Sequence, residues 1–212
     1  MKNLKQSGLG LVLVGATTLS LTLLSGCGTA VEPTTTAHAA NQSTAPMMKK
    51  GAEYNDQGAL IRPKDHREWV FIGAPVTPND MNNGKAAFPE FHNVYIDPMS
   101  FAEYKKTGTF PNGTVILKEL VSVGSKAMPS GNGYFQGNFV SLEAMVKDTK
   151  RFEEEPGGWA FFRFGEAPHY NPTGARMKTE SCNSCHSGAE EGYVFTDTYP
   201  VLRAAKAKVE AK

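Results

Sequence analysis

Five runs along the chain are predicted to be strands, some from a two-residue alternation of side chains and others from a high content of β-branched or aromatic residues. From 92 to 97, for example, His92, Val94 and Ile96 fall on one face and the intervening residues on the other. Glycine or proline follows most of these runs, as expected of strands joined by turns. The pattern therefore predicts strands at 69–73, 92–97, 114–123, 138–146 and 159–164.

The run from 138 to 146 is ambiguous, because Leu142, Met145 and Val146 also form a helical stripe. We favour a strand. That choice places Glu143 and Met145 on one face and Leu142 and Val146 on the other, since successive side chains of a strand point to opposite faces.

Helical signals are fewer and shorter. One turn is predicted at 65–69, after a proline, and a short helix at 101–106. Ser100 is the expected N-cap of that helix and Gly108 its C-terminal stop. A closing helix is predicted at 200–208, with proline in its first turn. Together these elements predict an α+β fold, mainly antiparallel β-sheet with a few short helices.

The N-terminus has the pattern of an export signal of the lipoprotein type, covering 1–26. Two lysines precede an apolar run that is too short and too interrupted to cross a membrane. The sequence Leu24-Ser25-Gly26-Cys27 resembles a bacterial lipobox, whose cysteine is acylated after cleavage. Ordinary cleavage after Ala37-His38-Ala39 is the alternative. Either reading predicts export to the periplasm, with a possible lipid anchor at Cys27 in the first.

Residues 27–50 are rich in Thr, Ala, Pro, Asn, Gln and Ser and show no apolar period, which is typical of a flexible tether. The remaining chain, 51–212, is long enough for one core of ordinary size and is predicted to be a single domain.

The charge balance argues against a polyanionic partner. Beyond the signal, 20 basic residues face 21 acidic ones, which gives a net charge of −1. Nucleic-acid-binding domains carry a basic patch, so no nucleic acid is expected. A small, weakly charged ligand fits better.

The sequence Cys182-Asn183-Ser184-Cys185-His186 is the attachment pattern of a c-type haem. In that reading Cys182 and Cys185 form thioethers with the haem vinyl groups, and His186 is the axial iron ligand. Bacterial c-type haem is attached outside the cytoplasm, which agrees with the export signal. The motif follows a stretch from Gly165 that has no clear period and is predicted to be irregular.

Two other readings of the motif are weaker. A zinc site needs four ligands, and no second cysteine pair exists to complete one. A thioredoxin-like dithiol would lie beside a βαβ pattern, which the chain does not show.

Lys118 interrupts a strand that is otherwise apolar on the face it shares with Ile116 and Leu120. If that face is buried, the amine is favoured in its neutral, nucleophilic form. If the strand lies at the edge of the sheet, the lysine protects the edge against aggregation. The pattern alone favours the second reading.

Glu143 and His92 leave similar choices open. Glu143 could be a general base near the iron or the partner of a surface lysine. His92 could be a distal group or a core histidine with satisfied hydrogen bonds. The eight methionines offer sixth iron ligands, although buried methionine is usually core filler.

Six segments, in order, resemble the cytochrome P-460 family, and the likeness extends from about Tyr54 to Lys206. They are Arg67-Glu68-Trp69-Val70, Val94-Tyr95-Ile96-Asp97-Pro98, Tyr104-Lys105-Lys106-Thr107-Gly108, Val115-Ile116-Leu117-Lys118-Glu119-Leu120, Gly131-Asn132-Gly133-Tyr134-Phe135 and Tyr199-Pro200-Val201-Leu202-Arg203-Ala204-Ala205-Lys206.

The resemblance implies a mainly antiparallel β protein, usually a homodimer, with one five-coordinate c-type haem. It implies a further covalent bond from the macrocycle to a lysine, here Lys118. The carboxylate above the iron corresponds to Glu143, and the proximal ligand to His186. Members that oxidise hydroxylamine carry an arginine where this chain has His92, so a permanent cation is replaced by a group that ordinarily titrates near neutrality.

The activity that the resemblance implies is oxidation of hydroxylamine to nitrous oxide or nitric oxide, with electrons passed to an acceptor such as a cytochrome. Cytochrome c′-beta resembles the same fold, lacks the crosslink and binds nitric oxide in an apolar pocket. Phe88, Phe91 and Phe135 could line such a pocket here. A plain electron carrier with a methionine ligand is a third reading.

Overall fold

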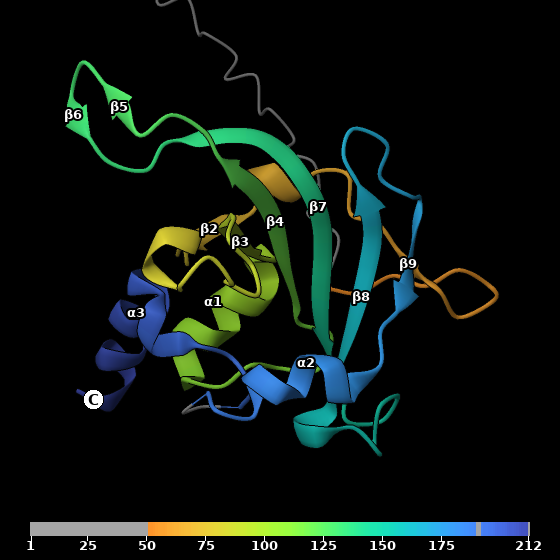
Figure 1. Ribbon diagram of the computed structural model, residues 1–212. Helices are drawn as coiled ribbons and strands as arrows, with labels where there is room; N and C mark the ends of the chain where they lie inside the picture. The colour runs from red at the N-terminus through yellow and green to blue at the C-terminus, as the bar shows by residue number, and fades with distance from the viewer. Residues whose placement is uncertain (1–50, 190–191, 212) are drawn as a thin grey trace, which may run out of the picture. The chain divides into compact units, whose positions relative to one another are not determined.

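The computed structural model describes residues 51–189 and 192–211 (Figure 1). The predicted signal at 1–26 and tether at 27–50 lie outside the described residues, so these two assignments stay predictions. No helix among the described residues is long and apolar enough to cross a membrane.

A seven-stranded antiparallel sheet forms the body of the domain, in the order β1-β9-β8-β7-β4-β3-β2. Its strands are β1 (Leu60–Ile61), β2 (Val70–Gly73), β3 (Phe91–Ile96), β4 (Val115–Val123), β7 (Gln136–Lys147), β8 (Trp159–Glu166) and β9 (Thr173–Arg176). A separate hairpin of β5 (Ala127–Met128) and β6 (Gly131–Asn132) extends away from the sheet (Figure 1).

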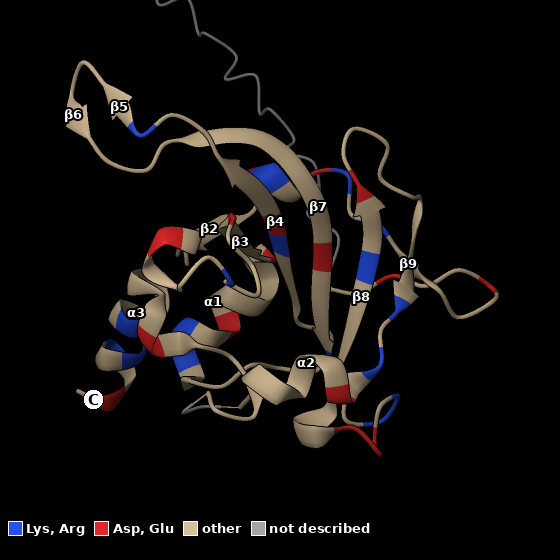
Figure 2. Ribbon diagram, viewed as in Figure 1, with Lys and Arg blue, Asp and Glu red and all other residues tan. Residues whose placement is uncertain are grey.

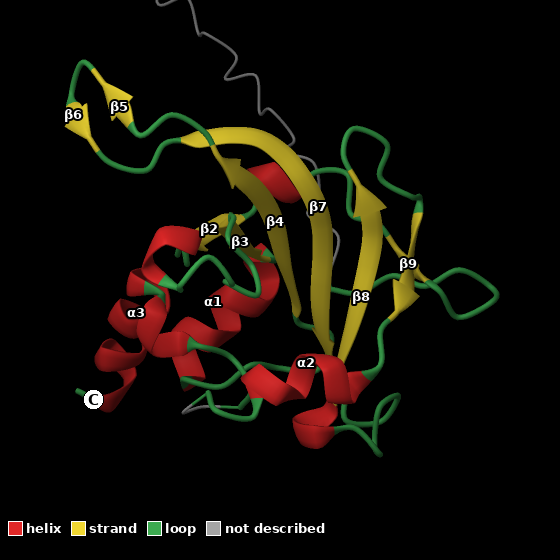
Figure 3. Cartoon of the chain, in the orientation of Figure 1, coloured by secondary structure: helices red, strands yellow, loops and turns green. Residues whose placement is uncertain are grey.

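Three α-helices accompany the sheet: α1 (Pro98–Thr107), α2 (Thr179–His186) and α3 (Pro200–Glu210). Helices α1 and α3 lie against each other beside β2 and β3, whereas α2 lies near the ends of β7 and β8 (Figure 3). Four short 3₁₀ helices span His66–Glu68, Asn79–Met81, Pro156–Gly158 and Thr196–Thr198.

The predicted α+β class with a mainly antiparallel sheet is confirmed, and each of the five predicted strands is present. The prediction of an irregular stretch from Gly165 is wrong, because this stretch contains β9 and leads into α2. The sequence pattern predicts neither element, because β9 has only four residues, one of them a glycine, and α2 has no apolar stripe.

The start of α1 also differs from the prediction. Asp97, not Ser100, is the N-cap, and its carboxylate Oδ1 accepts a hydrogen bond from the Ser100 backbone N–H at 2.8 Å. Pro98 then occupies the first helical position, where its missing N–H costs nothing. Gly108 closes the helix in the left-handed conformation at φ 72°, as predicted.

Strand β4 is paired on both edges, with β3 and β7, and each of its faces packs against a core cluster. Ile116 belongs to a core cluster with residues of α1 and α3, whereas Val115 and Leu117 belong to a second cluster on the other face. The two-residue alternation therefore divides one apolar strand between two cores.

Glu119 is 0% exposed on the same face as Leu117. Arg67 Nη2 donates to its Oε1 at 2.6 Å, and His66 Nε2 lies 3.6 Å from the same oxygen. Burial alone would raise the pKa of Glu119, but the hydrogen bonds from His66 and Arg67 outweigh it and lower the pKa. The carboxylate is therefore held ionised inside the protein.

We expect Asp97→Ala to lower the free energy of unfolding by roughly 2–4 kcal/mol. The variant loses the helix cap and also leaves the buried Val115 N–H, which donates to Asp97 Oδ2 at 3.0 Å, without an acceptor. Ser100→Ala is the matched control and should cost less than about 1 kcal/mol, because the Ser100 hydroxyl does not cap the helix. Urea unfolding measures both. An equal loss in the two variants would contradict the assignment of Asp97 as the cap.

Candidate functional site

A cavity of about 550 Å³ is enclosed by one face of the sheet, helix α2 and the segments that flank them. This volume is within the usual range of small-molecule and cofactor sites. All six residues singled out from the sequence contribute to its lining: His92, Lys118, Glu143, Cys182, Cys185 and His186. They come from β3, β4, β7 and α2, so residues up to 94 positions apart in the chain meet at one site.

Helix α2 carries the two cysteines and the histidine at spacings of three and four residues, which places them on one side of the helix. Both thiols are free, so no disulfide joins them. Cys182 packs against the core and Cys185 is exposed. Burial raises the pKa of the Cys182 thiol. The sulfur atoms are thus available for bonds to a bound group.

His186 is held in one tautomer. Its Nδ1 lies 2.7 Å from the carbonyl oxygen of Tyr193. A carbonyl can only accept, so Nδ1 carries the proton and Nε2 keeps its lone pair. The ring lies between those of Phe161 and Phe195, with centroid distances of 4.9 and 5.0 Å. Burial lowers the pKa of His186, which favours the neutral imidazole that metals bind.

Lys118 and Glu143 are directly opposite each other on β4 and β7, and Lys118 Nζ lies 2.9 Å from Glu143 Oε2. The edge-strand interpretation of Lys118 is wrong, because β4 lies between β3 and β7. The ammonium also lies 4.2 Å from the centroid of the Phe88 ring. A charged pair is therefore present inside a largely apolar cavity.

Arg163 adds a second cation beside Glu143, and the sequence analysis did not identify it. It pairs with Glu143 across β7 and β8, with Nη1 4.0 Å from Oε1. Charges of alternating sign thus follow one another across β4, β7 and β8 (Figure 2). Only the register of two strand pairs reveals this row; the local sequence around Arg163 does not.

His92 differs from the sequence-based expectation of a group that titrates near neutrality. Burial lowers its pKa to about 4, and the charge of Lys118 acts in the same direction. Hydrogen bonding to the Phe88 backbone and the charge of Glu143 oppose the shift only in part. Its buried Nε2 has no hydrogen-bond partner among the described residues. His92 is therefore a neutral group with an unused polar atom, and not a core histidine with satisfied hydrogen bonds.

Aromatic side chains form much of the cavity wall, but they are mostly not those expected. Phe88 lines the cavity, whereas Phe91 and Phe135 are not part of its lining. Their places are taken by residues from β8 and from the segment after α2, namely Phe161, Phe162 and Phe195.

These features fit a haem better than a bare metal ion. No group of three or more His, Cys, Asp or Glu side chains suited to a metal ion occurs in the described part of the chain, so these residues form no zinc site. A porphyrin brings four nitrogen ligands of its own and needs only an axial histidine. The free Nε2 of His186, the two thiols and the apolar walls match that need.

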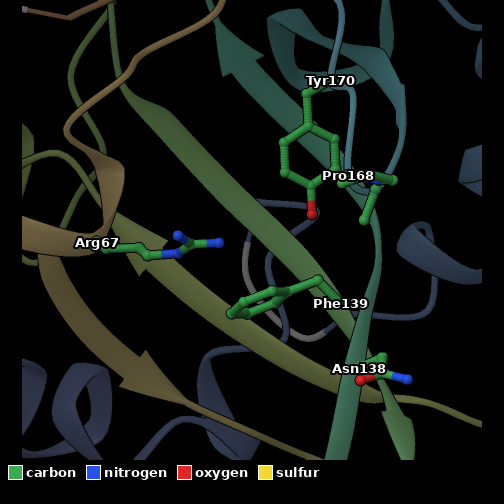
Figure 4. A pocket seen from close by; sticks show the side chains of 6 residues that line it. Arg67, Asn138, Phe139, Pro168 and Tyr170 are labelled. Carbon is green, nitrogen blue, oxygen red and sulfur yellow. The ribbon is translucent and has the colours of Figure 1, made fainter.

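A second cavity of about 470 Å³ lies around Arg67, Phe139 and Tyr170 (Figure 4). The Arg67 guanidinium lies 4.2 Å from the centroid of the Phe139 ring. Its charge is already engaged by the buried Glu119, which faces away from Lys118 on β4. This cavity is therefore separate from the one that contains the cysteines.

No curated protein matches the chain. A family model described as Cytochrome P460 matches residues 63–196, which is more than half of the sequence and includes all six residues named above. The chain therefore belongs to the cytochrome P460 family of c-type haem proteins.

Proposed function

We propose that this protein oxidises hydroxylamine at a haem held in the 550 Å³ cavity. The observation that supports the proposal most is the Lys118–Glu143 ion pair, which lines the same cavity as His186 and the two cysteines. A cavity that only bound an apolar gas would gain nothing from burying these charges.

Three residues of α2 would hold the cofactor. We propose thioethers from Cys182 and Cys185, and an axial bond from His186 Nε2. The carbonyl of Tyr193 keeps that nitrogen free of a proton. Lys118 would provide the further covalent bond that the family resemblance implies. When bound, the haem supplies the electron-accepting iron and an open position for a small nitrogen compound.

Glu143 would receive protons from the substrate. Hydroxylamine must lose protons as it loses electrons, and a carboxylate inside the cavity can accept them. Glu143 is only 8% exposed, so little water screens the carboxylate. His92, which is neutral and has an unused Nε2, can accept a hydrogen bond from the bound molecule.

We also propose the product, the electron acceptor, the cellular location and the oligomeric state. The product is nitrous oxide or nitric oxide, and a cytochrome takes the electrons. The export signal at 1–26 supports a periplasmic location, with a lipid anchor at Cys27. The family resemblance supports a homodimer.

Binding of nitric oxide, as in cytochrome c′-beta, is the second candidate function. The aromatic walls formed by Phe88, Phe161, Phe162 and Phe195 favour it. Met145 and Met177 also line the cavity. An electron carrier with a methionine ligand to the iron is therefore the third candidate function.

The Lys118 bond to the haem can be tested by spectroscopy and peptide mass. We expect a strongly red-shifted Soret band in the dithionite-reduced wild type, and no tryptic cleavage after Lys118, because a bonded lysine is not a trypsin site. The peptide 107–126 should then remain attached through the haem to the peptide with Cys182 and Cys185. Lys118→Arg should lose both signatures.

Lys147→Arg is the matched control, since Lys147 is also partly buried but does not line the cavity. It should behave as wild type. A normal c-type Soret band with a free Lys118 in the wild type would contradict the crosslink and favour nitric oxide binding. A six-coordinate iron that ignores small ligands would favour the electron carrier.

Glu143→Gln should keep the haem and the Lys118 tether but lower hydroxylamine turnover by a factor of about 10² to 10⁴, the usual cost of losing a general base. Steady-state oxidation with an artificial electron acceptor measures the loss. Glu154→Gln is the control, because Glu154 pairs with Arg176 at the surface and does not line the cavity. Unchanged turnover in Glu143→Gln would remove this residue from the mechanism.

A further inference from the structure

Glu143 lies between two cations that come from the strands on either side of it. Lys118 from β4 approaches Oε2 at 2.9 Å, and Arg163 from β8 lies 4.0 Å from Oε1. The three residues are directly opposite one another in the register of β4, β7 and β8 (Figure 2). The closer cation is Lys118, so in this state Arg163 is the secondary partner.

In the proposed function, Lys118 is no longer the main charged partner of Glu143. An amine nitrogen that is bonded to the haem macrocycle no longer carries the ammonium charge, so Glu143 loses its closer partner. Glu143 is only 8% exposed. A buried carboxylate without a cation tends to take up a proton, and a protonated carboxyl cannot accept another from the substrate.

We propose that Arg163 is the positioning residue that keeps Glu143 ionised and oriented once Lys118 has lost its charge. This inference rests on the proposed function. Arginine suits the part because its guanidinium remains charged at every physiological pH. Glu166 holds Arg163 Nη2 at 3.1 Å, which leaves Nη1 directed at Glu143. The guanidinium therefore lies near two carboxylates, those of Glu166 and Glu143.

The other titratable groups around the cavity cannot replace Arg163. They are His92 from β3, Cys182, Cys185 and His186 from α2, and Tyr199 before α3. The two histidines have lowered pKa values and are neutral near pH 7, and burial raises the pKa of Tyr199 to about 12. The thiols are neutral when protonated and remain uncharged as thioethers. Among the described residues that line the cavity or pair with Glu143, Arg163 is thus the permanent cation that remains once Lys118 is bonded.

The size of the effect is limited by solvent. The Arg163 side chain is 44% exposed, so water screens its charge more than it screens that of Lys118, which is 24% exposed.

The test is a set of variants in the haem-loaded protein, read by infrared spectroscopy at neutral pH. The carboxylic acid C=O band of Glu143 is identified as the band that Glu143→Gln removes. Lys118→Gln mimics the loss of the lysine charge whether or not the crosslink forms. We expect no such band in the wild type or in Lys118→Gln, and a clear band in the double variant Lys118→Gln with Arg163→Gln.

Two further variants separate position from general charge. Arg163→Lys should restore the ionised carboxylate in part, because it returns a cation to the same place. Arg176→Gln is the matched control: its side chain is 43% exposed on the neighbouring β9 and is paired with Glu154 and Glu155. It should leave the infrared spectrum of Glu143 unchanged.

A band already present in Lys118→Gln alone would overturn the proposal, as would its absence from the double variant. In a protein that turns over hydroxylamine, Arg163→Gln should also move the acid limb of the pH profile to higher pH, because removing a cation favours the protonated carboxyl. If the wild type shows no turnover while the infrared pattern holds, the proposed function fails and the role of Arg163 stands.

Discussion

The register of β4 is the constraint on which the rest of the structure depends. Lys118 and Glu119 are consecutive, so their side chains point to opposite faces of an interior strand. One faces the cavity of the cysteines and the other is fully enclosed with Arg67. A slip of one residue would exchange them, which would leave a lysine buried among apolar side chains and remove the amine from the cavity.

Lys118 and Glu119 both have partners on other elements of the fold, and these partners favour one register of β4. Glu119 accepts from Arg67, and Lys118 meets Glu143. Buried ion pairs contribute little net stability compared with apolar residues of the same shape, but breaking one costs several kcal/mol. The apolar neighbours of β4 thus supply the stability of the sheet, whereas its two charged residues select one alignment over the alternatives.

The sequence predicted what depends on local pattern and missed what depends on pairing. The strands followed from alternation, and the haem motif from three residue types at fixed spacing. The sequence did not predict Arg163 or the Tyr193 carbonyl. The register of β7 and β8 places Arg163, and the conformation of the loop after α2 places the carbonyl. The start of α1 was misplaced because Asp97 and Ser100, three positions apart, are both good N-caps. The structure selects Asp97, whose carboxylate accepts from the N–H groups of Ser100 and Val115.

The charges around the cavity depend on which side chains become neutral when they are buried. His186 and His92 are both driven to the neutral form, because a buried imidazolium would be costly. Arginine cannot respond in this way, and Arg163 remains partly exposed to water and paired with Glu166. This chain has a neutral histidine at the position where the family resemblance implies a cation, and it has Arg163 on the β8 side of Glu143. Glu143 therefore lies between Lys118 of β4 and Arg163 of β8, and His92 lines the same cavity as a neutral group.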